Sequence, residues 1–139
     1  MTNQKGFSIV EILLSSAMLA MIVTAFTGAI IYGEQITQVA GGISRASFLA
    51  QEGIEATRSI RDQSFSNLIN GSYGLAVSGN KWVFSGNSDA TNGFVRQIVV
   101  SDGTDSNRKT ITSTVIWQET IQRTGNVGLT TEFSNWKNN

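Results

Sequence analysis

A long apolar segment near the N-terminus constrains the fold more than any other feature of this sequence. Residues 7–32 read FSIVEILLSSAMLAMIVTAFTGAIIY, in which 19 of 26 residues are apolar and Glu11 is the only charged residue. The 21 residues 12–32 carry no charge, and as an α-helix they would span about 31 Å, the hydrocarbon thickness of a bilayer. Residues 33–139 are too few to bury such a helix on all sides, so the segment predicts a transmembrane helix.

The charges that flank this segment predict its orientation. Lys5 is the only charged residue before it, whereas Glu34 is the first charged residue after it. The positive-inside rule therefore places the N-terminus in the cytoplasm and the polar part of the chain outside. A secretory signal peptide cut near Gly28 is the alternative, but the run exceeds the usual length and contains a carboxylate.

Composition excludes several classes of function. The chain has 10 Lys and Arg, 10 Asp and Glu, and no His, Cys or Pro. Zero net charge argues against a nucleic-acid-binding protein, and a chain without Cys forms no disulfide, thiolate nucleophile or Cys-based zinc site. Without His it also lacks the commonest general base and metal ligand. We therefore expect a protein that is not an enzyme and needs no cofactor.

Residues 5–14, KGFSIVEILL, place a basic residue, a Gly, a Phe and a Glu directly before a membrane-length apolar run. This pattern resembles the N-terminus of type IV prepilins and pseudopilins. The resemblance implies that a membrane-embedded prepilin peptidase removes the leader, residues 1–6, by cutting between Gly6 and Phe7. It also implies N-methylation of Phe7.

Glu11 is expected to act in assembly and register. After cleavage, the new amine on Phe7 lies four residues before Glu11, so the carboxylate can meet the amine of a neighbouring subunit. A paired charge in a dry interface costs much less than an unpaired one, so a subunit out of register would be disfavoured. Two alternatives remain: Glu11 pairs within its own chain, or it is a polar residue that snorkels to the membrane surface.

Residues 33–62 are expected to continue the helix with an amphipathic face. Apolar residues recur at three- and four-residue steps and are flanked by others that widen the face: Ile36, Val39, Ile43, Ala46, Phe48, Leu49, Ala50, Ile54, Ala56 and Ile60. Gly28, Gly41 and Gly42 are candidate hinges, since glycine weakens a helix. The alternative is that they allow close helix packing.

Residues 63–139 are expected to form a β-rich head. Five strands are predicted at residues 75–77, 81–84, 94–101, 109–117 and 127–133, with turns at residues 92–93 and 102–103. Short turns favour an antiparallel meander, and its apolar face would pack on the second half of the helix. The predicted class is α+β, a long N-terminal helix on a small antiparallel sheet, as in the pilin-like roll.

The head offers few candidate sites. Asp102 and Asp105 are a partial set of oxygen ligands for calcium, and a plain hairpin turn is the favoured interpretation. Four cations are expected on the solvated surface rather than in a DNA-binding patch, and the three tryptophans in the core or an interface. These residues are Arg96, Arg108, Lys109, Arg123, Trp82, Trp117 and Trp136.

The leading hypothesis is therefore a structural subunit of a helical filament. Its expected partners are copies of itself or related pilins, prepilin peptidase, the inner-membrane assembly machinery and the lipid bilayer before assembly. It would span the inner membrane once, and then enter an extracellular pilus or a periplasmic pseudopilus. A major pilin, a minor pilin, a competence pilin and a pseudopilin of type II secretion all fit. The alternative is a single-pass membrane-anchored extracellular binding module.

Overall fold

The computed structural model describes residues 6, 8–120 and 122–138. The chain divides into two compact units, an N-terminal unit that ends at Gln38 and a C-terminal unit that begins at Val39. The sequence predicted this change of character after Tyr32. It falls later because Ile36 is still 52% exposed, whereas Val39 is the first half-buried residue of the described helix.

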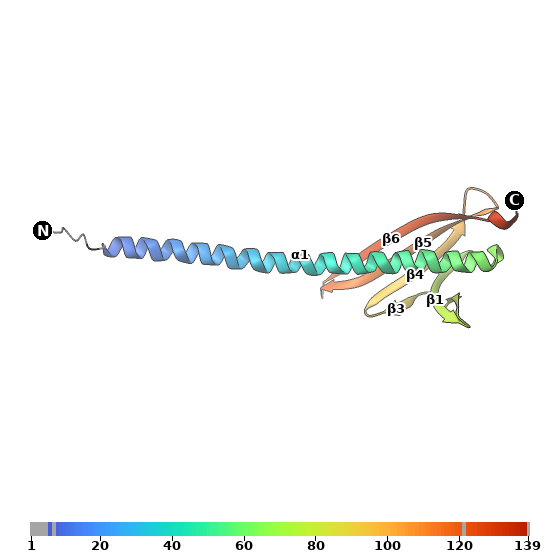
Figure 1. Cartoon of the computed structure of the whole chain (residues 1–139), viewed down its shortest axis with the longest axis horizontal. Helices are drawn as coiled ribbons and strands as arrows, with labels where there is room; N and C mark the ends of the chain where they lie inside the picture. The colour runs from blue at the N-terminus through green and yellow to red at the C-terminus, as the bar shows by residue number, and fades with distance from the viewer. Residues whose placement is uncertain (1–5, 7, 121, 139) are drawn as a thin grey trace. The chain divides into compact units, whose positions relative to one another are not determined.

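One helix, α1 (Ile9–Gln63), contributes residues to both units (Figure 1). Ser8 immediately precedes the helix, and its carbonyl accepts hydrogen bonds from the Glu11 and Ile12 N–H groups at 3.0 and 3.2 Å. The helix continues through all of its glycines because each costs at most about 1 kcal/mol and no proline interrupts the backbone. This confirms the predicted long helix and its end near residue 62.

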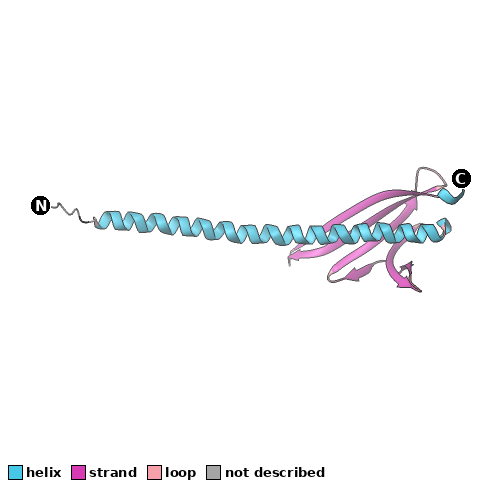
Figure 2. Cartoon of the chain, in the orientation of Figure 1, coloured by secondary structure: helices cyan, strands magenta, loops and turns pink. Residues whose placement is uncertain are grey.

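Six strands follow the helix and form one antiparallel sheet (Figure 2). They are β1 (Gly71–Ser78), β2 (Lys81–Ser85), β3 (Asp89–Thr91), β4 (Phe94–Asp102), β5 (Arg108–Thr120) and β6 (Arg123–Ser134). Two short 3₁₀ turns, η1 (Phe65–Asn67) and η2 (Trp136–Asn138), precede and follow the sheet. All five predicted strands are present and are longer than predicted, and β3 was missed.

The strand order is β2-β1-β4-β5-β6, with β3 also paired to β4. The predicted meander is therefore correct for β4, β5 and β6 and for the pairing of β1 with β2, and it is wrong where β2 would pair with β4. There, β1 pairs with β4 rather than only with its neighbour in sequence, and β3 pairs with the other end of β4. The Asn92-Gly93 turn between β3 and β4 has φ angles of 50° and 83°, which match a tight hairpin turn.

The sheet packs against the part of α1 that belongs to the C-terminal unit. The predicted inward face of β5 is confirmed, since Ile111, Ser113, Val115 and Trp117 are all buried. The buried residues of α1 are mostly small: Ala46, Ala50, Gly53, Ile54, Ala56, Thr57 and Ile60.

Three residues expected on this helix face are exposed, and the first is Ile36, at 52%. Ile43 is 46% exposed and Phe48 is 68% exposed. Phe48 lies two residues from both Ala46 and Ala50, which is about 200° around a helix, so it faces away from the sheet. The apolar character of Phe48 suggested burial, but its helical phase prevents it.

Gly53 lies where α1 comes closest to the middle of the sheet. A Cβ atom at Gly53 would lie 2.5 Å from the Ser113 Oγ and 2.9 Å from the Ile98 Cδ1. Both of these residues are fully buried and have no room to move. Thr57 fits beside this contact because its hydroxyl donates a hydrogen bond of 2.8 Å to the Gly53 carbonyl of the same helix. Glycine at position 53 thus sets the distance between helix and sheet.

We expect Gly53→Ala to lower the free energy of unfolding by about 1–3 kcal/mol, because overpacking outweighs the gain in helix propensity. Gly41→Ala is the matched control, since a Cβ there meets no atom within 4 Å. It should be neutral or stabilise by up to about 1 kcal/mol. Chemical denaturation of the detergent-solubilised chain measures both, and equal effects would contradict the close packing at Gly53.

Candidate functional site

The N-terminal unit exposes nearly all of its apolar side chains. Fifteen large ones are each at least 49% exposed: Ile9, Val10, Ile12, Leu13, Leu14, Met18, Leu19, Met21, Ile22, Val23, Phe26, Ile30, Ile31, Tyr32 and Ile36. Soluble monomers rarely expose apolar patches beyond a few hundred Å². This surface therefore requires cover from lipid or from other protein.

Length and hydropathy agree with this requirement. In the part of the chain that the structure describes, α1 is the one helix long and apolar enough to cross a membrane. The mean hydropathy of its membrane-length window is 2.2, and none of that window is buried within the protein. The helix is thus compatible with a single-pass membrane anchor near the N-terminus.

The serine and threonine hydroxyl groups in the helical part of this unit are already satisfied. Each donates to a backbone carbonyl one turn earlier, at 2.7–2.9 Å: Ser15, Ser16, Thr24, Thr27 and Thr37. A polar group that enters an apolar environment without a hydrogen bond costs several kcal/mol, so this internal bonding suits a dry surrounding. The hydroxyls therefore do not prevent insertion of the helix.

Glu11 is the only charged residue within the apolar run, residues 7–32, and Glu34 follows the run. Glu11 lies in the first turn of α1, where the helix dipole favours a negative charge, and its side chain is exposed. None of the ion pairs between described residues includes Glu11. Gly6 is also exposed, with open space around its Cα. Phe7, the expected site of cleavage and methylation, lies outside the described residues.

The three candidate hinge glycines have different surroundings. Gly28 and Gly41 face open space, whereas a Cβ atom at Gly42 would lie 2.8 Å from the Trp117 Nε1. Gly42 therefore lies at a close contact between α1 and the sheet, which neither the hinge nor the alternative of close helix packing predicted. The helix itself is unbroken at all three positions.

Arg96 is buried, which corrects its expected place on the solvated surface. It is 6% exposed, and its guanidinium binds Asp89 through Nη2–Oδ2 at 2.8 Å and Nε–Oδ1 at 3.3 Å. It also donates from Nη1 to the Glu52 carboxylate at 3.1 Å and to the Leu49 carbonyl at 3.2 Å. Asp89 in turn accepts the Leu75 N–H at 2.9 Å. Arg96 thus connects α1, β1 and β3 from its position on β4.

A sequence signal for the burial of Arg96 was present. Ile98 and Val100 are buried on the same face of β4, and Arg96 is two residues before them, so the alternation places it inward. An inward arginine needs carboxylates nearby, but these come from β3 and α1, and β3 was not predicted. The charge pairing could therefore not be found from the sequence.

The other three cations that were considered for DNA contact are also paired with carboxylates. Arg108 binds Asp105 at 3.3 Å and Glu132 at 3.2 Å, Lys109 binds Asp102 at 2.7 Å, and Arg123 lies 2.9 Å from the Glu119 carboxylate. Each of the four cations considered for DNA contact thus has a neutralising partner. This arrangement does not form a basic patch of the kind that binds phosphates.

The candidate calcium ligands do not share one site. Asp102 accepts hydrogen bonds from Lys109 at 2.7 Å and Asn70 at 2.9 Å, whereas Asp105 bonds the Asn107 N–H and pairs with Arg108. The Lys109 and Asn70 hydrogen bonds hold the pKa of Asp102 below its ordinary value of 3.8. Among the described residues no group of three potential metal ligands is found. The loop between β4 and β5 is built as a hairpin.

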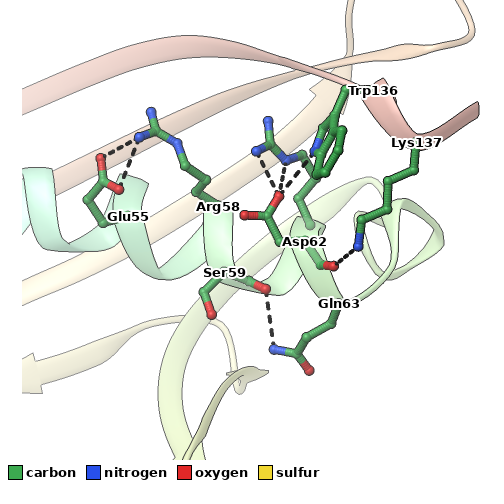
Figure 3. Close-up of polar contacts among 8 residues, drawn as sticks. Glu55, Arg58, Ser59, Asp62, Gln63, Trp136 and Lys137 are labelled. Carbon is green, nitrogen blue, oxygen red and sulfur yellow. Dashed lines mark hydrogen bonds and ion pairs between the residues drawn. The ribbon is translucent and has the colours of Figure 1, made fainter. Parts of the chain in front are cut away.

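The C-terminal segment contacts the end of α1 (Figure 3). The Trp136 Nε1 donates to the Asp62 carboxylate at 3.4 Å, and the Lys137 ammonium donates to the Asp62 carbonyl. The hydrogen bond from Arg61 lowers the pKa of Asp62, with smaller contributions from Trp136 and Lys137. The tryptophans were expected in the core or an interface: Trp117 is buried in the core, whereas Trp136 is 57% exposed and is not part of the core, so for Trp136 an interface stays a prediction.

Comparison of the chain with protein-family models, with curated proteins and with solved structures found no match in any of the three.

Arg96→Ala should lower the free energy of unfolding by about 3–5 kcal/mol, because it leaves Asp89 buried without its cation. Asp89 is only 19% exposed in its pair with Arg96. Glu55→Gln is the control, since it breaks the exposed pair with Arg58 and should cost less than about 1 kcal/mol. Denaturant titration measures the free energy of unfolding of both variants. Similar losses in the two would contradict a stabilising role for the buried Arg96 pairs.

We expect the free energy of unfolding to fall as the pH drops below about 4.5. The pKa of Glu132 is lowered from its ordinary 4.5 by hydrogen bonds from the Thr104 N–H and hydroxyl and from Arg108, and that of Asp102 is lowered from 3.8. A carboxyl with a lowered folded-state pKa stabilises the fold above its unfolded pKa and loses this effect as the pH falls through the folded pKa. The free energy of unfolding, measured with denaturant, should change less between pH 7 and pH 3 in the Asp102→Asn, Glu132→Gln double variant than in the wild type. An equal change in both proteins would contradict this prediction.

Proposed function

We propose that this chain is a structural subunit of a type IV pilus or pseudopilus, processed by prepilin peptidase and polymerised through its N-terminal helix. The observation that carries the proposal is Glu11, an exposed carboxylate without a described ion-pair partner in the first turn of an uncovered apolar helix. It follows Gly6-Phe7 at the spacing that resembles prepilins. An anchor that serves only as a tether has no use for a charge at this position.

Cleavage after Gly6 would create the partner that Glu11 lacks. The new Phe7 amine is cationic at neutral pH, and a neighbouring subunit displaced along the filament axis can bring its own amine to the Glu11 carboxylate. A charge pair formed in a dry interface is strongly destabilised when one partner is missing. Only one axial displacement pairs both groups, so Glu11 would specify the register of the subunits.

Packing of the apolar helices would supply the remaining attraction. Lipid tails are as apolar as the helix, so helices associate in a membrane by close packing and polar contacts. The N-terminal unit offers small residues for this packing, among them Ala17, Ala20, Ala25 and Gly28. The hydroxyls of Ser15, Ser16, Thr24 and Thr27 are bonded to backbone carbonyls of the same helix, so these four groups are satisfied in a dry interface. The subunit would therefore pass from lipid into a filament core without a large polar penalty.

Gly6→Leu should leave the leader uncut, because a bulky side chain hinders approach of the peptidase to the bond after residue 6. In the natural host, mass spectrometry of the purified chain should find the N-terminal peptide beginning at Phe7 for the wild type and at Met1 for the variant. Asn3→Leu, an apolar change in the same leader, is the control and should be cut normally. Wild-type chains that retain residues 1–6 would refute processing.

Glu11→Val should insert into the membrane but assemble poorly, because the register charge is lost while the helix becomes more apolar. Membrane fractionation should recover the variant at the wild-type level, and sheared filaments should contain at least tenfold less of it. Glu34→Val is the control, since Glu34 is the other acidic residue of this unit and follows the apolar run. Normal filaments made of Glu11→Val alone would refute the register role.

A further inference from the structure

Three side chains at one end of the sheet form a closed set of short hydrogen bonds. The Lys109 Nζ donates to the Asn70 Oδ1 at 2.7 Å and to the Asp102 Oδ1 at 2.7 Å. The Asn70 Nδ2 donates to the second oxygen of the same carboxylate, the Asp102 Oδ2, at 2.9 Å. The amine thus lies at the amide carbonyl, and Asp102 bridges the amine and the amide nitrogen.

The fold holds these residues together from three neighbouring strands. Asp102 ends β4 and pairs directly with Lys109 near the start of β5, while Asn70 immediately precedes β1, whose first residue Gly71 pairs with Val100 of β4. The side chain of Lys109 is only 18% exposed, whereas that of Asp102 is 77% exposed. Residues far apart in the sequence therefore meet at one end of the sheet, with the amine on the less exposed side.

We propose that Lys109 and Asn70 form an intramolecular isopeptide bond, with Asp102 as the proton carrier. An amine, a carboxamide and a bridging carboxylate are the groups that such a reaction requires. The Nζ is held within hydrogen-bond distance of the Asn70 carbonyl oxygen, so the amine needs no bimolecular encounter to reach the adjacent Cγ. Intramolecular reactions with well-oriented groups reach effective molarities of about 10⁵ M or more. The proposal does not depend on the filament function.

The reaction balances without any further reagent. Asp102 takes a proton from the Lys109 ammonium, and the neutral Nζ attacks the Asn70 Cγ to form a carbon–nitrogen bond. Asp102 then returns the proton to the Asn70 Nδ2, the bond between Cγ and Nδ2 breaks, and ammonia leaves and takes up the second amine proton as ammonium. Asp102 is regenerated as a carboxylate, in agreement with its contacts to both nitrogens.

The crosslink would give the C-terminal unit a covalent tie that the chain otherwise lacks. The sequence contains no Cys, so no disulfide can connect distant segments. A bond between residues 70 and 109 would join β1 to β5 across β4 and restrict the unfolded chain, as a disulfide does. It would also resist separation of these strands under pulling force.

The intact wild-type chain tests this proposal, so the result does not depend on how a variant folds. We expect full-length protein, purified from membranes in detergent and then denatured, to lack the mass of one ammonia. Tryptic digestion should give two peptides joined between Lys109 and Asn70, with no cleavage after Lys109. Lys109→Arg should restore the full mass, whereas Lys81→Arg, the matched control in β2, should keep the loss. Asp102→Asn should lower the crosslinked fraction at least tenfold.

Two outcomes would overturn the proposal. A wild-type chain of full mass means that the three groups form an ordinary ion pair. A linear peptide that lacks ammonia at Asn70-Gly71 and is cleaved after Lys109 means that Asn70 forms a succinimide with its own backbone instead.

Discussion

The exposed apolar surface of the N-terminal part of α1 is the feature on which the proposed function depends. Fifteen large apolar side chains of the N-terminal unit are exposed on every side of α1, and the described chain buries none of them. The hydrophobic effect makes such a surface unstable in water at this size. In the proposed function, lipid covers this surface before assembly and neighbouring helices cover it in the filament. Glu11 matters because it is the one charge within the apolar run, residues 7–32.

In the C-terminal unit, the sheet must stay packed on one helix without the help of disulfides, because the sequence contains no Cys. Small helix residues allow close approach, and Gly53 against Ser113 is the tightest contact. Arg96 adds a buried polar connection between four elements through Asp89, Glu52 and the Leu49 carbonyl. A buried ion pair is weak evidence for net stability, but removal of one partner is costly, so this network favours one arrangement of helix and strands.

Local patterns in the sequence predicted most of the elements. The length of α1 follows from the apolar run and the periodic positions after it, and the alternation of β5 predicted its buried face. The pairing of β1 with β4 was not predicted, because local turn signals reveal only neighbours in sequence. Phe48 was predicted on the packed helix face because it is apolar, although its position around the helix turns it away from the sheet. Arg96 was predicted on the surface because the carboxylates that bind it come from distant segments of the sequence. Glu11 was found because a single charge in an apolar run is visible without tertiary structure, whereas the contacts of Asn70, Asp102 and Lys109 require the sheet.

The most direct test of the central claim is the composition of surface filaments. Filaments sheared from the natural host and purified should contain this chain, and mass spectrometry should find its N-terminal peptide beginning at a methylated Phe7. A chain found only in membranes, with residues 1–6 still attached and absent from any filament, would contradict the account and favour a membrane-anchored module.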